Sequence, residues 1–480
     1  MGRDSEEEEA LTAALVAAAM LDVDGDGGGE DAAGPVSTTG MVYFSTFVAA
    51  CGQFGYGCAG GYPSQAESGI INDLGLSIAE YSVFASTMTF GGILGAIING
   101  KVADLTGRKG AMWLSNMLGI IGWLAIIFAK DVWWLDVGRL SMGVGYMIIL
   151  YVTNIYVAEI TPSKTRGAFT ACNVMMLVLG VSLMYVIGNF LAWRTLAICA
   201  LVPSVVQTIG LFFVPESPRW LAKIGRETEM ASTLQRLRGK NVDISLESIE
   251  IMEHTKTFEH LSKGSIFDLF QRKYAHSLVI GMGIMLLVQF GGNNGILYYA
   301  SSIFENAGAS SSVGTTCMAI IQIPFTALNV LLVDKIGRRP LLMASAAGTC
   351  LGSILAGLAF LFQDLHYPSE IPSTLVLIGI LVYSASTSAG LNGTPWIVVS
   401  EIFPVNIRGS AGSVVVFCMS VGAWIVTLTF NFIFEWSSAG IFFIYAAFCG
   451  SIVIFVAKLV PETNGRSLEE IQASLTLLQQ

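Results

Sequence analysis

The chain contains 480 residues, of which 53% are hydrophobic and only 12% are charged, and its formal net charge is −10. A soluble domain carries roughly 25% charged residues, so this composition excludes an ordinary soluble protein and indicates a chain that crosses a membrane several times. The negative balance says little about partners, because much of the acid lies in the N-terminal tail and in the central loop.

The first 40 residues predict a disordered, acidic, cytosolic tail. They contain the stretches SEEEEA and DVDGDGGGEDAAG, which hold too few apolar residues to fold alone. The apolar run from Ala10 to Leu21 is too short to cross a membrane and follows four glutamates, so it is not a normal signal peptide. From Asp22 the spacing imitates a calcium-binding loop, but the closing position holds Ala33 where a glutamate is needed, and no metal site is predicted.

Twelve apolar runs follow, each near the roughly 20 residues that a membrane-spanning helix needs. Glycines recur within them, as expected where spanning helices pack closely. These runs predict an all-α membrane protein with twelve transmembrane helices. The predicted spans lie near residues 41–61, 84–103, 111–129, 134–158, 168–190, 194–214, 276–301, 313–333, 340–362, 372–399, 411–434 and 439–459.

Lys and Arg are distributed unequally between the two sides of the predicted membrane. The loops 62–83, 302–312, 363–371 and 435–438 contain neither residue type, whereas the alternate loops carry most of the basic residues. Since short basic loops stay in the cytosol, we expect the basic side and both chain termini to be cytosolic.

One long polar stretch, residues 215–275, separates the spans into two groups of six. Its segments RETEMASTLQRLRG and ISLESIEIMEHTKTFEHL show helical periodicity with charges on one face, which predicts a small helical linker. The predicted organisation is the tail at 1–40, an N-terminal six-helix bundle at 41–214, the linker, a C-terminal six-helix bundle at 276–460 and a cytosolic tail at 461–480.

Two charged motifs occur once in each half of the chain. The spacing D-x-x-G-R-[K/R] begins at Asp104 and again 230 residues later at Asp334, each time between two apolar runs. The spacing E-I-x-P-x-x-x-R-G begins at Glu159 and again 242 residues later at Glu401. Two ordered motifs at constant offsets are improbable by chance, so the halves are predicted to be two related bundles.

The repeated motifs predict a charged gate on the cytosolic side. In each D-x-x-G-R-[K/R] motif the aspartate ends one helix and the glycine permits a tight turn. The acidic and basic side chains are expected to form salt bridges between helices, which hold the cytosolic side shut and break when it opens. The candidate gate residues are Asp104, Arg108, Lys109, Glu159, Arg166, Asp334, Arg338, Arg339, Glu401 and Arg408. The alternative is that these charges only anchor the topology.

Cysteine and histidine usage indicates no metal, cofactor or catalytic chemistry. The eight cysteines lie almost all in apolar runs without a CxxC pair, and the four histidines lie in or beside loops. Cysteines in this setting are typically small buried residues. A membrane enzyme needs clustered catalytic groups within its spans. The sequence offers no such cluster, so we expect that the protein is not an enzyme. We also expect no nucleic-acid partner and a monomer.

The most distinctive stretches of the chain are DLTGRKG, YVAEITPSKTRG, PESPRWL, QFGGNNGILYY, DKIGRRP, TPWIVVSEIFPVNIRG and VPETNGRSLEEIQ. From about residue 41 to 472 they resemble the sugar porters of the major facilitator superfamily. The stretches AEYSVFAS, GRKGAMW, LRGKNVDIS and FNFIFEWSSAG resemble its plant early-responsive-to-dehydration-like branch of monosaccharide transporters. The resemblance implies two six-helix bundles around a central cavity, alternating access, and the vacuolar rather than the plasma membrane.

The resemblance also implies where a sugar binds. Sugar hydroxyls need hydrogen-bonding side chains, and a sugar ring needs an aromatic platform. The candidate binding residues are Gln289 and Asn294 on helix seven, Gln322 on helix eight, and Trp396 with Asn392 on helix ten; Tyr298 and Tyr299 match the family's gating pair. Asn392 also opens a glycosylation sequon, which should stay unmodified inside a helix. The alternative for each residue is a role in helix packing.

At three places the chain departs from the sugar-porter pattern. Val288 stands where the family usually has the first of two glutamines, and Val174 follows the helix-five asparagine where a glutamine is usual. Met419 and Ser420 replace an Asn-Trp pair in helix eleven. A net hydrogen bond contributes roughly 0.5–1.5 kcal/mol, so the loss of two or three weakens hexose binding by about tenfold to a thousandfold unless other groups substitute.

The first helix bears on energy coupling. Proton-coupled relatives carry an aspartate in the motif FGYD, whereas this chain has QFGYG, with Gly57 at that position. No Asp or Glu is expected deep within a span, and Arg139 has no evident carboxylate partner. We therefore expect facilitated diffusion of a monosaccharide, a hexose. The alternatives are a proton-coupled sugar carrier, a polyol or inositol carrier, and a non-transporting sugar sensor on the same scaffold.

Overall fold

The computed structural model describes residues 39–162, 165–261, 271–404 and 407–464. Most of the predicted acidic tail, and the C-terminal tail from residue 465, lie outside these ranges. The described helices are, in chain order, α2 (Gly40–Leu74), α3 (Ile78–Ile127), α4 (Val132–Ile160), α5 (Arg166–Ile187), α6 (Trp193–Leu211), α7 (Pro218–Lys223), α8 (Glu227–Arg238), α9 (Ser245–Leu261), α10 (Arg272–Phe290), α11 (Asn293–Tyr298), α12 (Ala300–Asn306), α13 (Ser311–Ile336), α14 (Arg338–Asp364), α15 (Glu370–Ser386), η2 (Thr387–Leu391), α16 (Thr394–Ile402), α17 (Arg408–Trp436) and α18 (Ser438–Leu459).

Each of the twelve predicted spans corresponds to a helical segment of the described chain. Within the described residues, ten helical stretches are long and apolar enough to cross a membrane by length and composition. One of them, α3, contains two crossings, because Gly107 interrupts its helical backbone with a φ of 78°. The more polar α2 supplies the remaining crossing. The predicted all-α fold of twelve transmembrane helices is therefore confirmed.

The first helix continues past the predicted end of its span. The sequence predicted a loop at 62–83, but α2 runs to Leu74 and ends at Gly75, whose left-handed φ of 64° closes the last turn. This part of the prediction was wrong. The polar residues that suggested a loop, such as Ser64 and Glu67, are buried against other helices rather than exposed to solvent.

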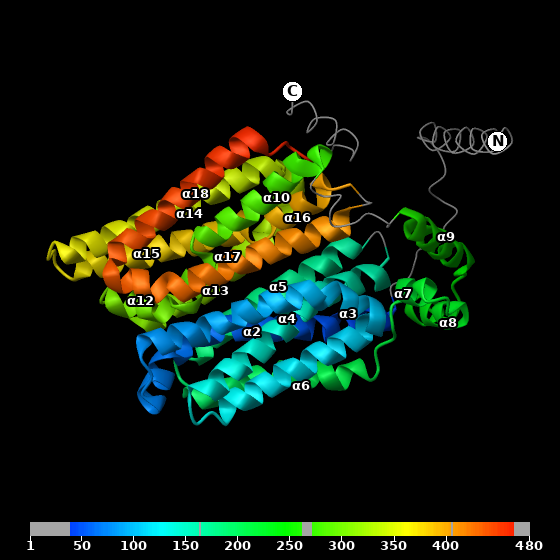
Figure 1. Ribbon diagram of the computed structural model, residues 1–480, viewed down its shortest axis with the longest axis horizontal. Helices are drawn as coiled ribbons and strands as arrows, with labels where there is room; N and C mark the ends of the chain where they lie inside the picture. The colour runs from blue at the N-terminus through cyan, green and yellow to red at the C-terminus, as the bar shows by residue number, and fades with distance from the viewer. Residues whose placement is uncertain (1–38, 163–164, 262–270, 405–406, 465–480) are drawn as a thin grey trace.

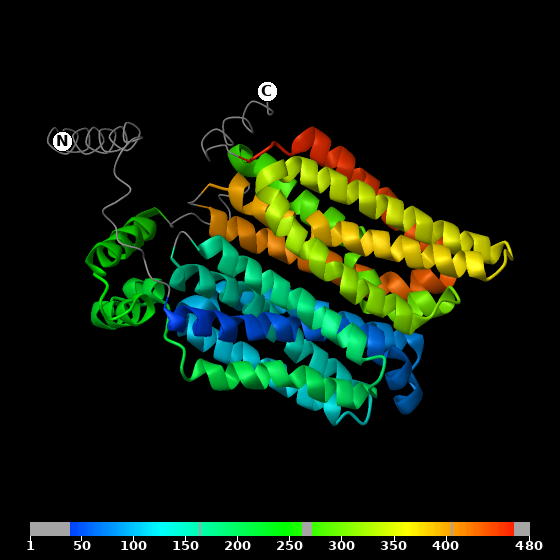
Figure 2. The same cartoon turned by 180° about the vertical axis from the view of Figure 1, so that it is seen from behind.

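The transmembrane helices form two bundles that lie side by side, α2–α6 and α10–α18 (Figures 1 and 2). They contact each other mainly through α17 against α3 and α13 against α5. The short helices α7, α8 and α9 lie beside one end, which also carries the turns at Gly107 and Gly337. We call this the linker end, and the opposite end, with the turns at Gly75 and Gly308, the far end.

Two spans of the C-terminal bundle are interrupted along their length. Between α10 and α11, Gly292 takes a φ of 94°, and a Cβ there would lie 2.3 Å from the ring of Tyr445. The Tyr383 hydroxyl donates to the carbonyl of Gly291 at 2.9 Å. The π-helical stretch η2 separates α15 from α16 in the same way. Such stretches are frequent at functional sites, so the interruptions mark a region where ligand-binding residues are expected.

The helices α2 and α5 cross with their backbones almost in contact. A Cβ on Gly57 would lie 2.0 Å from the carbonyl oxygen of Leu177, and a Cβ on Gly180 would lie 2.2 Å from that of Phe54. Only glycine permits this approach, because any side chain would push the two backbones apart. In this packing there is no room for a carboxylate side chain at residue 57.

We predict that Gly57→Ala destabilises the protein, whereas Gly60→Ala does not. Both residues lie in α2, so both substitutions gain the same helix propensity, about 1 kcal/mol. A Cβ on Gly60 would meet nothing closer than 3.8 Å, whereas the methyl at residue 57 overpacks the crossing, which costs about 1–3 kcal/mol. Thermal unfolding of the purified proteins in detergent measures the difference, and equal melting temperatures for the two variants would contradict the prediction.

Candidate functional site

A first charge cluster joins α3, α4 and α7 at the linker end. The guanidinium of Arg108 donates to both carboxylate oxygens of Glu159, at 2.9 and 2.8 Å, and each side chain is only 12% exposed. The Ser217 hydroxyl donates to the same carboxylate at 2.6 Å. Asp104 lies 3.7 Å from Arg108 and 3.0 Å from Lys223. Two-pronged arginine–carboxylate pairs are strong and directional, so the cluster fixes the relative positions of these helices.

Glu216 binds the backbone of the turn at Gly107. Its carboxylate accepts hydrogen bonds from the N–H groups of Arg108, Lys109 and Ser217, at 3.0, 3.2 and 2.8 Å. A Cβ on Gly107 would lie 2.4 Å from this carboxylate. A glycine is therefore needed here for two reasons: the backbone has a positive φ, and Glu216 approaches too closely for any side chain. Burial raises the pKa of the Glu216 carboxyl above its ordinary value, while the three N–H donors oppose that rise.

A second cluster repeats this arrangement in the C-terminal bundle. Arg338 donates to Glu401 at 3.0 Å. The carboxylate of Glu462 accepts from the N–H groups of Arg338 and Arg339, at 3.0 and 3.1 Å. A Cβ on Gly337, whose φ is 97°, would lie 2.8 Å from that carboxylate. Both halves of the chain thus build one cluster around a glycine turn, an arginine and two glutamates.

The two clusters differ in the number of hydrogen bonds that Glu159 on α4 and Glu401 on α16 accept. Both oxygens of Glu159 accept hydrogen bonds, whereas one oxygen of Glu401 is buried without a partner among the described residues. Where Ser217 donates to Glu159, the second cluster has Asn464, which accepts from Arg338 at 2.6 Å instead. The first cluster is therefore the more completely bonded of the two.

The other predicted gate residues take different positions. Asp334 lies 3.3 Å from the arginine of its own cluster, and Arg339 donates to a backbone carbonyl of α18. Arg166 has a buried Nε without a hydrogen-bond partner in the described ranges, and for Arg408 the structure describes the backbone but not the side chain. The pairs of Arg108 with Glu159 and of Arg338 with Glu401 each link helices of one bundle, so neither of them holds the two bundles together.

Two members of the clusters, Glu216 and Glu462, were missed by the sequence analysis. A signal for them exists, because the triplet Val-Pro-Glu occurs at 214–216 and again at 460–462, a third repeat with an offset of 246. These stretches were assigned to the linker and to the C-terminal tail, where charged residues are usually solvated. They were therefore not paired with the glycine turns.

The side-chain amides of the predicted binding residues form hydrogen bonds with one another or with side chains of neighbouring helices. Asn294 Nδ2 donates to Gln289 Oε1 at 2.9 Å across the interruption between α10 and α11. Gln322 on α13 donates to the Ser384 hydroxyl on α15 at 3.0 Å. Gln289 and Gln322 are 7% and 9% exposed. A ligand would have to exchange its own hydroxyls for these hydrogen bonds.

Trp396 and Asn392 lie beside the second interruption, between η2 and α16. The indole of Trp396 is 38% exposed and the side chain of Asn392 is exposed. Neither side chain forms a hydrogen bond with another described residue. An exposed aromatic ring near an unbonded amide is available to a ligand that has both an apolar face and hydroxyl groups.

The positions that depart from the sugar-porter pattern differ in exposure. Val174 on α5 is 40% exposed, whereas Val288 is buried in the core of the C-terminal bundle. Met419 packs partly buried against the same core. Ser420 is buried, and its hydroxyl has no partner within the described chain. Of the apolar replacements, Val174 is thus the one that leaves the most apolar surface uncovered.

The predicted gating pair, Tyr298 and Tyr299, lies where the bundles meet. The Tyr298 hydroxyl lies 3.9 Å from the sulfur of Met88 on α3, and Arg139 donates to the same sulfur at 3.1 Å. The Tyr299 hydroxyl donates to the carbonyl of Thr427 at 3.2 Å, and its ring stacks on a phenylalanine of α17 with 4.8 Å between centroids. Both tyrosines are buried.

Hydrogen bonds join the two bundles toward the far end. The hydroxyls of Ser64 and Ser301 lie 3.0 Å apart, and Asn431 donates to the Ser82 hydroxyl at 3.0 Å. The remaining members of this far-end layer include Glu67 with Ser302, Tyr185 with the carbonyl of Leu297, and Ser182 with the carbonyl of Ala319. These hydrogen bonds between the bundles all lie toward the end that carries the turns at Gly75 and Gly308. Polar contacts therefore hold the two bundles together at the far end.

A buried polar cluster in the N-terminal bundle was not predicted. Gln53 donates to the Thr153 hydroxyl at 2.6 Å, and Asn173 donates to the side-chain oxygen of Asn154 at 3.2 Å. The side-chain oxygens of Gln53 and Asn173 are buried and have no partner within the described part of the chain. These oxygens can accept hydrogen bonds from water or from a hydroxylated ligand.

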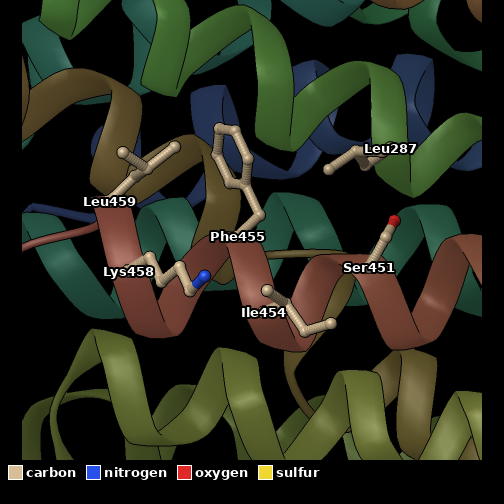
Figure 3. A pocket seen from close by; sticks show the side chains of 6 residues that line it. All are labelled: Leu287, Ser451, Ile454, Phe455, Lys458 and Leu459. Atoms are coloured by element: carbon tan, nitrogen blue, oxygen red, sulfur yellow. The ribbon is translucent and has the colours of Figure 1, made fainter.

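One groove lies away from all the candidate residues. It has a volume of about 430 Å³ and runs between α10 and α18, where Leu287 faces Ser451, Ile454, Phe455, Lys458 and Leu459 (Figure 3). Its walls are apolar apart from a serine and a lysine. None of the residues that line it is a binding or gate candidate, so it is separate from the site described above.

Comparisons with known proteins place these features in a family. The sequence model of the family "Sugar (and other) transporter" matches residues 37–475. "Sugar transporter ESL1" of Arabidopsis thaliana is 49% identical over 438 residues, which cover 91% of this chain and 93% of that protein. "Sugar transporter ERD6-like 7" of the same plant is also 49% identical and covers 90% of this chain and 94% of its own length.

Solved structures share the fold. The inward-open xylose transporter XylE from E. coli superposes with a TM-score of 0.77 at 23% identity, covering 90% of this chain and 99% of that one. The proton:xylose symporter XylE bound to 6-bromo-6-deoxy-D-glucose gives a TM-score of 0.75 at 24% identity, with 92% and 100% coverage. The chain therefore belongs to the sugar transporter family and has the fold of the major facilitator protein XylE; it is an integral, multi-pass membrane transporter rather than an enzyme.

Proposed function

We propose that the protein carries a monosaccharide, a hexose, by alternating access and facilitated diffusion. The observation that carries this proposal is the layer of neutral hydrogen bonds that joins the bundles at the far end, while the ion pairs of each charge cluster stay within one bundle. Two bundles that each stay intact while their contacts change ends are what a carrier built from repeats needs. A static receptor would gain nothing from such an arrangement.

The charge clusters keep each bundle intact during this movement. Each cluster joins helices of one bundle through the arginine and its glutamate, at 2.8 Å for Arg108 with Glu159 and at 3.0 Å for Arg338 with Glu401. Since neither pair joins the bundles, the linker end can open without breaking an ion pair. We assign the linker end to the cytosol because its loops carry most of the basic residues, and the vacuolar membrane as the location by analogy with the plant relatives. We also propose that the carrier is a monomer.

Sugar recognition is assigned to the interrupted spans of the C-terminal bundle. The exposed ring of Trp396 provides the platform, and the amides of Gln289 and Gln322 provide hydrogen bonds in exchange for those they now form. Each exchanged bond contributes a net of roughly 0.5–1.5 kcal/mol. The exposed apolar surface of Val174 offers no such bond, so the affinity for a hexose is expected to be low.

The absence of proton coupling is inferred from the first and fourth spans. Gly57 has no room for a carboxylate in this packing. Arg139 is fully buried, donates to the carbonyl of Ala59 at 2.9 Å, and lies over the rings of Phe84 and Tyr62 at 4.8 and 5.6 Å. No described carboxylate pairs with it. Without a carboxylate that exchanges a proton with this arginine, the sugar gradient alone drives transport.

Uptake of labelled glucose and fructose into proteoliposomes tests the proposal. We expect saturable uptake that an imposed proton gradient does not drive above the outside sugar concentration, because residue 57 has no room for the coupling carboxylate. Trp396→Ala is expected to reduce uptake at least tenfold, since loss of about 1.4 kcal/mol of binding is a factor of ten. Trp134→Ala, at a tryptophan that is 49% exposed at the start of α4, serves as the control and should keep normal uptake.

Accumulation of sugar above the outside concentration under a proton gradient would contradict facilitated diffusion. The absence of uptake of either sugar by folded protein would contradict hexose transport. Equal losses for the two tryptophan variants would contradict the assignment of the site.

The unequal clusters predict unequal effects of two matched substitutions. Glu159→Gln weakens three hydrogen bonds to a charged group, whereas Glu401→Gln weakens one. Each such bond contributes about 1.5–3 kcal/mol, so Glu159→Gln should lower the melting temperature and the maximal uptake rate more than Glu401→Gln. Thermal unfolding and initial uptake rates measure both, and a larger loss for Glu401→Gln would show that the bonding in the clusters does not set their strength.

A further inference from the structure

Glu67 is a carboxylate inside the far-end layer. It lies on the part of α2 that extends beyond the predicted first span, and it is 8% exposed. The hydroxyl of Ser302, on α12 of the other bundle, donates to it. One helical turn earlier, the Ser64 hydroxyl accepts from the backbone N–H of Ser301 at 2.9 Å. Two consecutive turns of α2 are thus bonded to the start of α12.

Among the described residues, no cation pairs with Glu67. The polar groups that act on it are hydroxyls, an amide and a carboxyl from neighbouring elements. They are Ser302 and Glu305 on α12, Asn431 on α17, Tyr81 on α3, and Tyr299 directly before α12. In the described ranges no Lys, Arg or His forms an ion pair with it. Its burial is therefore not compensated by an opposite charge.

Closing or opening of the far end consequently determines whether the protonated or the ionised form of Glu67 is favoured. A buried carboxylate without a cation is much less stable than one in water, and hydrogen bonds from neutral groups recover only part of the difference. The neutral acid avoids this penalty and keeps the bond from Ser302, because its carbonyl oxygen still accepts. When the bundles separate at the far end, Ser302 moves away with α12 and the carboxyl of Glu67 meets solution, where an ordinary Glu has a pKa of about 4.3.

We propose that Glu67 is a proton-binding site of the far-end layer, and that closing the far end takes up one proton from the solution on that side. The proposal rests on the alternating access described above. On closing, a proton from water or buffer forms an O–H bond on Glu67, and on opening that bond breaks and the proton returns to the same side. No proton crosses the membrane, so the site is compatible with facilitated diffusion.

The direction of the pH response follows from this balance. The closed far end binds one proton more than the open far end, so acid on the far side stabilises the closed form. A single proton changes the ratio of closed to open molecules by at most about tenfold per pH unit, and the response ends near the ordinary pKa of about 4.3, below which both forms are protonated. An acidic compartment on the far side would thus bias the empty carrier toward opening at the linker end.

The distance between spin labels across the far end tests the proposal without any sugar. The labels are placed at Asn72→Cys on α2 and Leu365→Cys after α14, two exposed residues outside the far-end layer, in protein whose native cysteines are replaced. Pulsed electron paramagnetic resonance then gives the population of the short, closed distance between pH 5 and pH 8. We expect this population to grow as the pH falls.

Three variants identify the titrating group. Glu67→Gln keeps an acceptor for Ser302 but cannot titrate, so its short-distance population should be high at every pH. Glu305→Gln, the matched control at the exposed carboxylate of the same helix α12, should keep the wild-type response. Ser302→Ala keeps the carboxyl group and should lower the closed population at every pH while leaving its pH dependence in place.

The outcomes separate this site from the proposed transport. A pH response that persists in Glu67→Gln, or a wild-type distance that does not change with pH, would overturn the proton site whatever sugar is carried. A response that disappears in Glu67→Gln alone would support it even in protein that failed to take up hexose.

Discussion

In each bundle a carboxylate occupies the space where a turn residue would otherwise have its side chain. Glu216 and Glu462 reach the N–H groups that follow Gly107 and Gly337 because those two residues have no Cβ. These N–H groups begin a helix, where they have no intrahelical partner and where the helix dipole favours an anion. The next residue is the arginine that pairs with a glutamate on another helix. In each bundle the turn, the bonds from its N–H groups to the glutamate and the neighbouring ion pair therefore depend on the absence of a side chain at the glycine.

Two kinds of bond divide the molecule into moving parts. Charged pairs with short distances act inside each bundle, whereas the bonds between bundles are mostly formed by neutral hydroxyl and amide groups. Bonds to charged groups are roughly twice as strong as neutral ones. The weaker set can exchange during a transport cycle while the stronger set persists. Glu67 is the exception among the weaker set, because its charge can be removed by a proton from solution.

The repeated motifs and hydrophobic runs were sufficient to predict the twelve-helix fold and the neighbourhood of Arg108 and Glu159. The sequence was less informative where burial depends on the other bundle. The polar second half of α2 has the composition of a loop, and contacts with α12 as well as with α3, α5 and α6 make it a buried helix. Glu216 and Glu462 were missed for a related reason, because a carboxylate near a span end is usually solvated. The mutual bonding of Gln289 and Asn294 depends on a helix interruption that no hydrophobic pattern announces.

The interruptions also make the mechanical compliance of the molecule uneven. In the N-terminal bundle, the glycine crossing of α2 with α5 locks two continuous helices backbone to backbone. In the C-terminal bundle, the regular backbone ladder already stops at Gly292 and again at η2, next to the residues assigned to the sugar. Local bending there breaks few additional backbone hydrogen bonds. A substrate can therefore deform one half of the carrier at little energetic cost, while the other half transmits the motion as a rigid body.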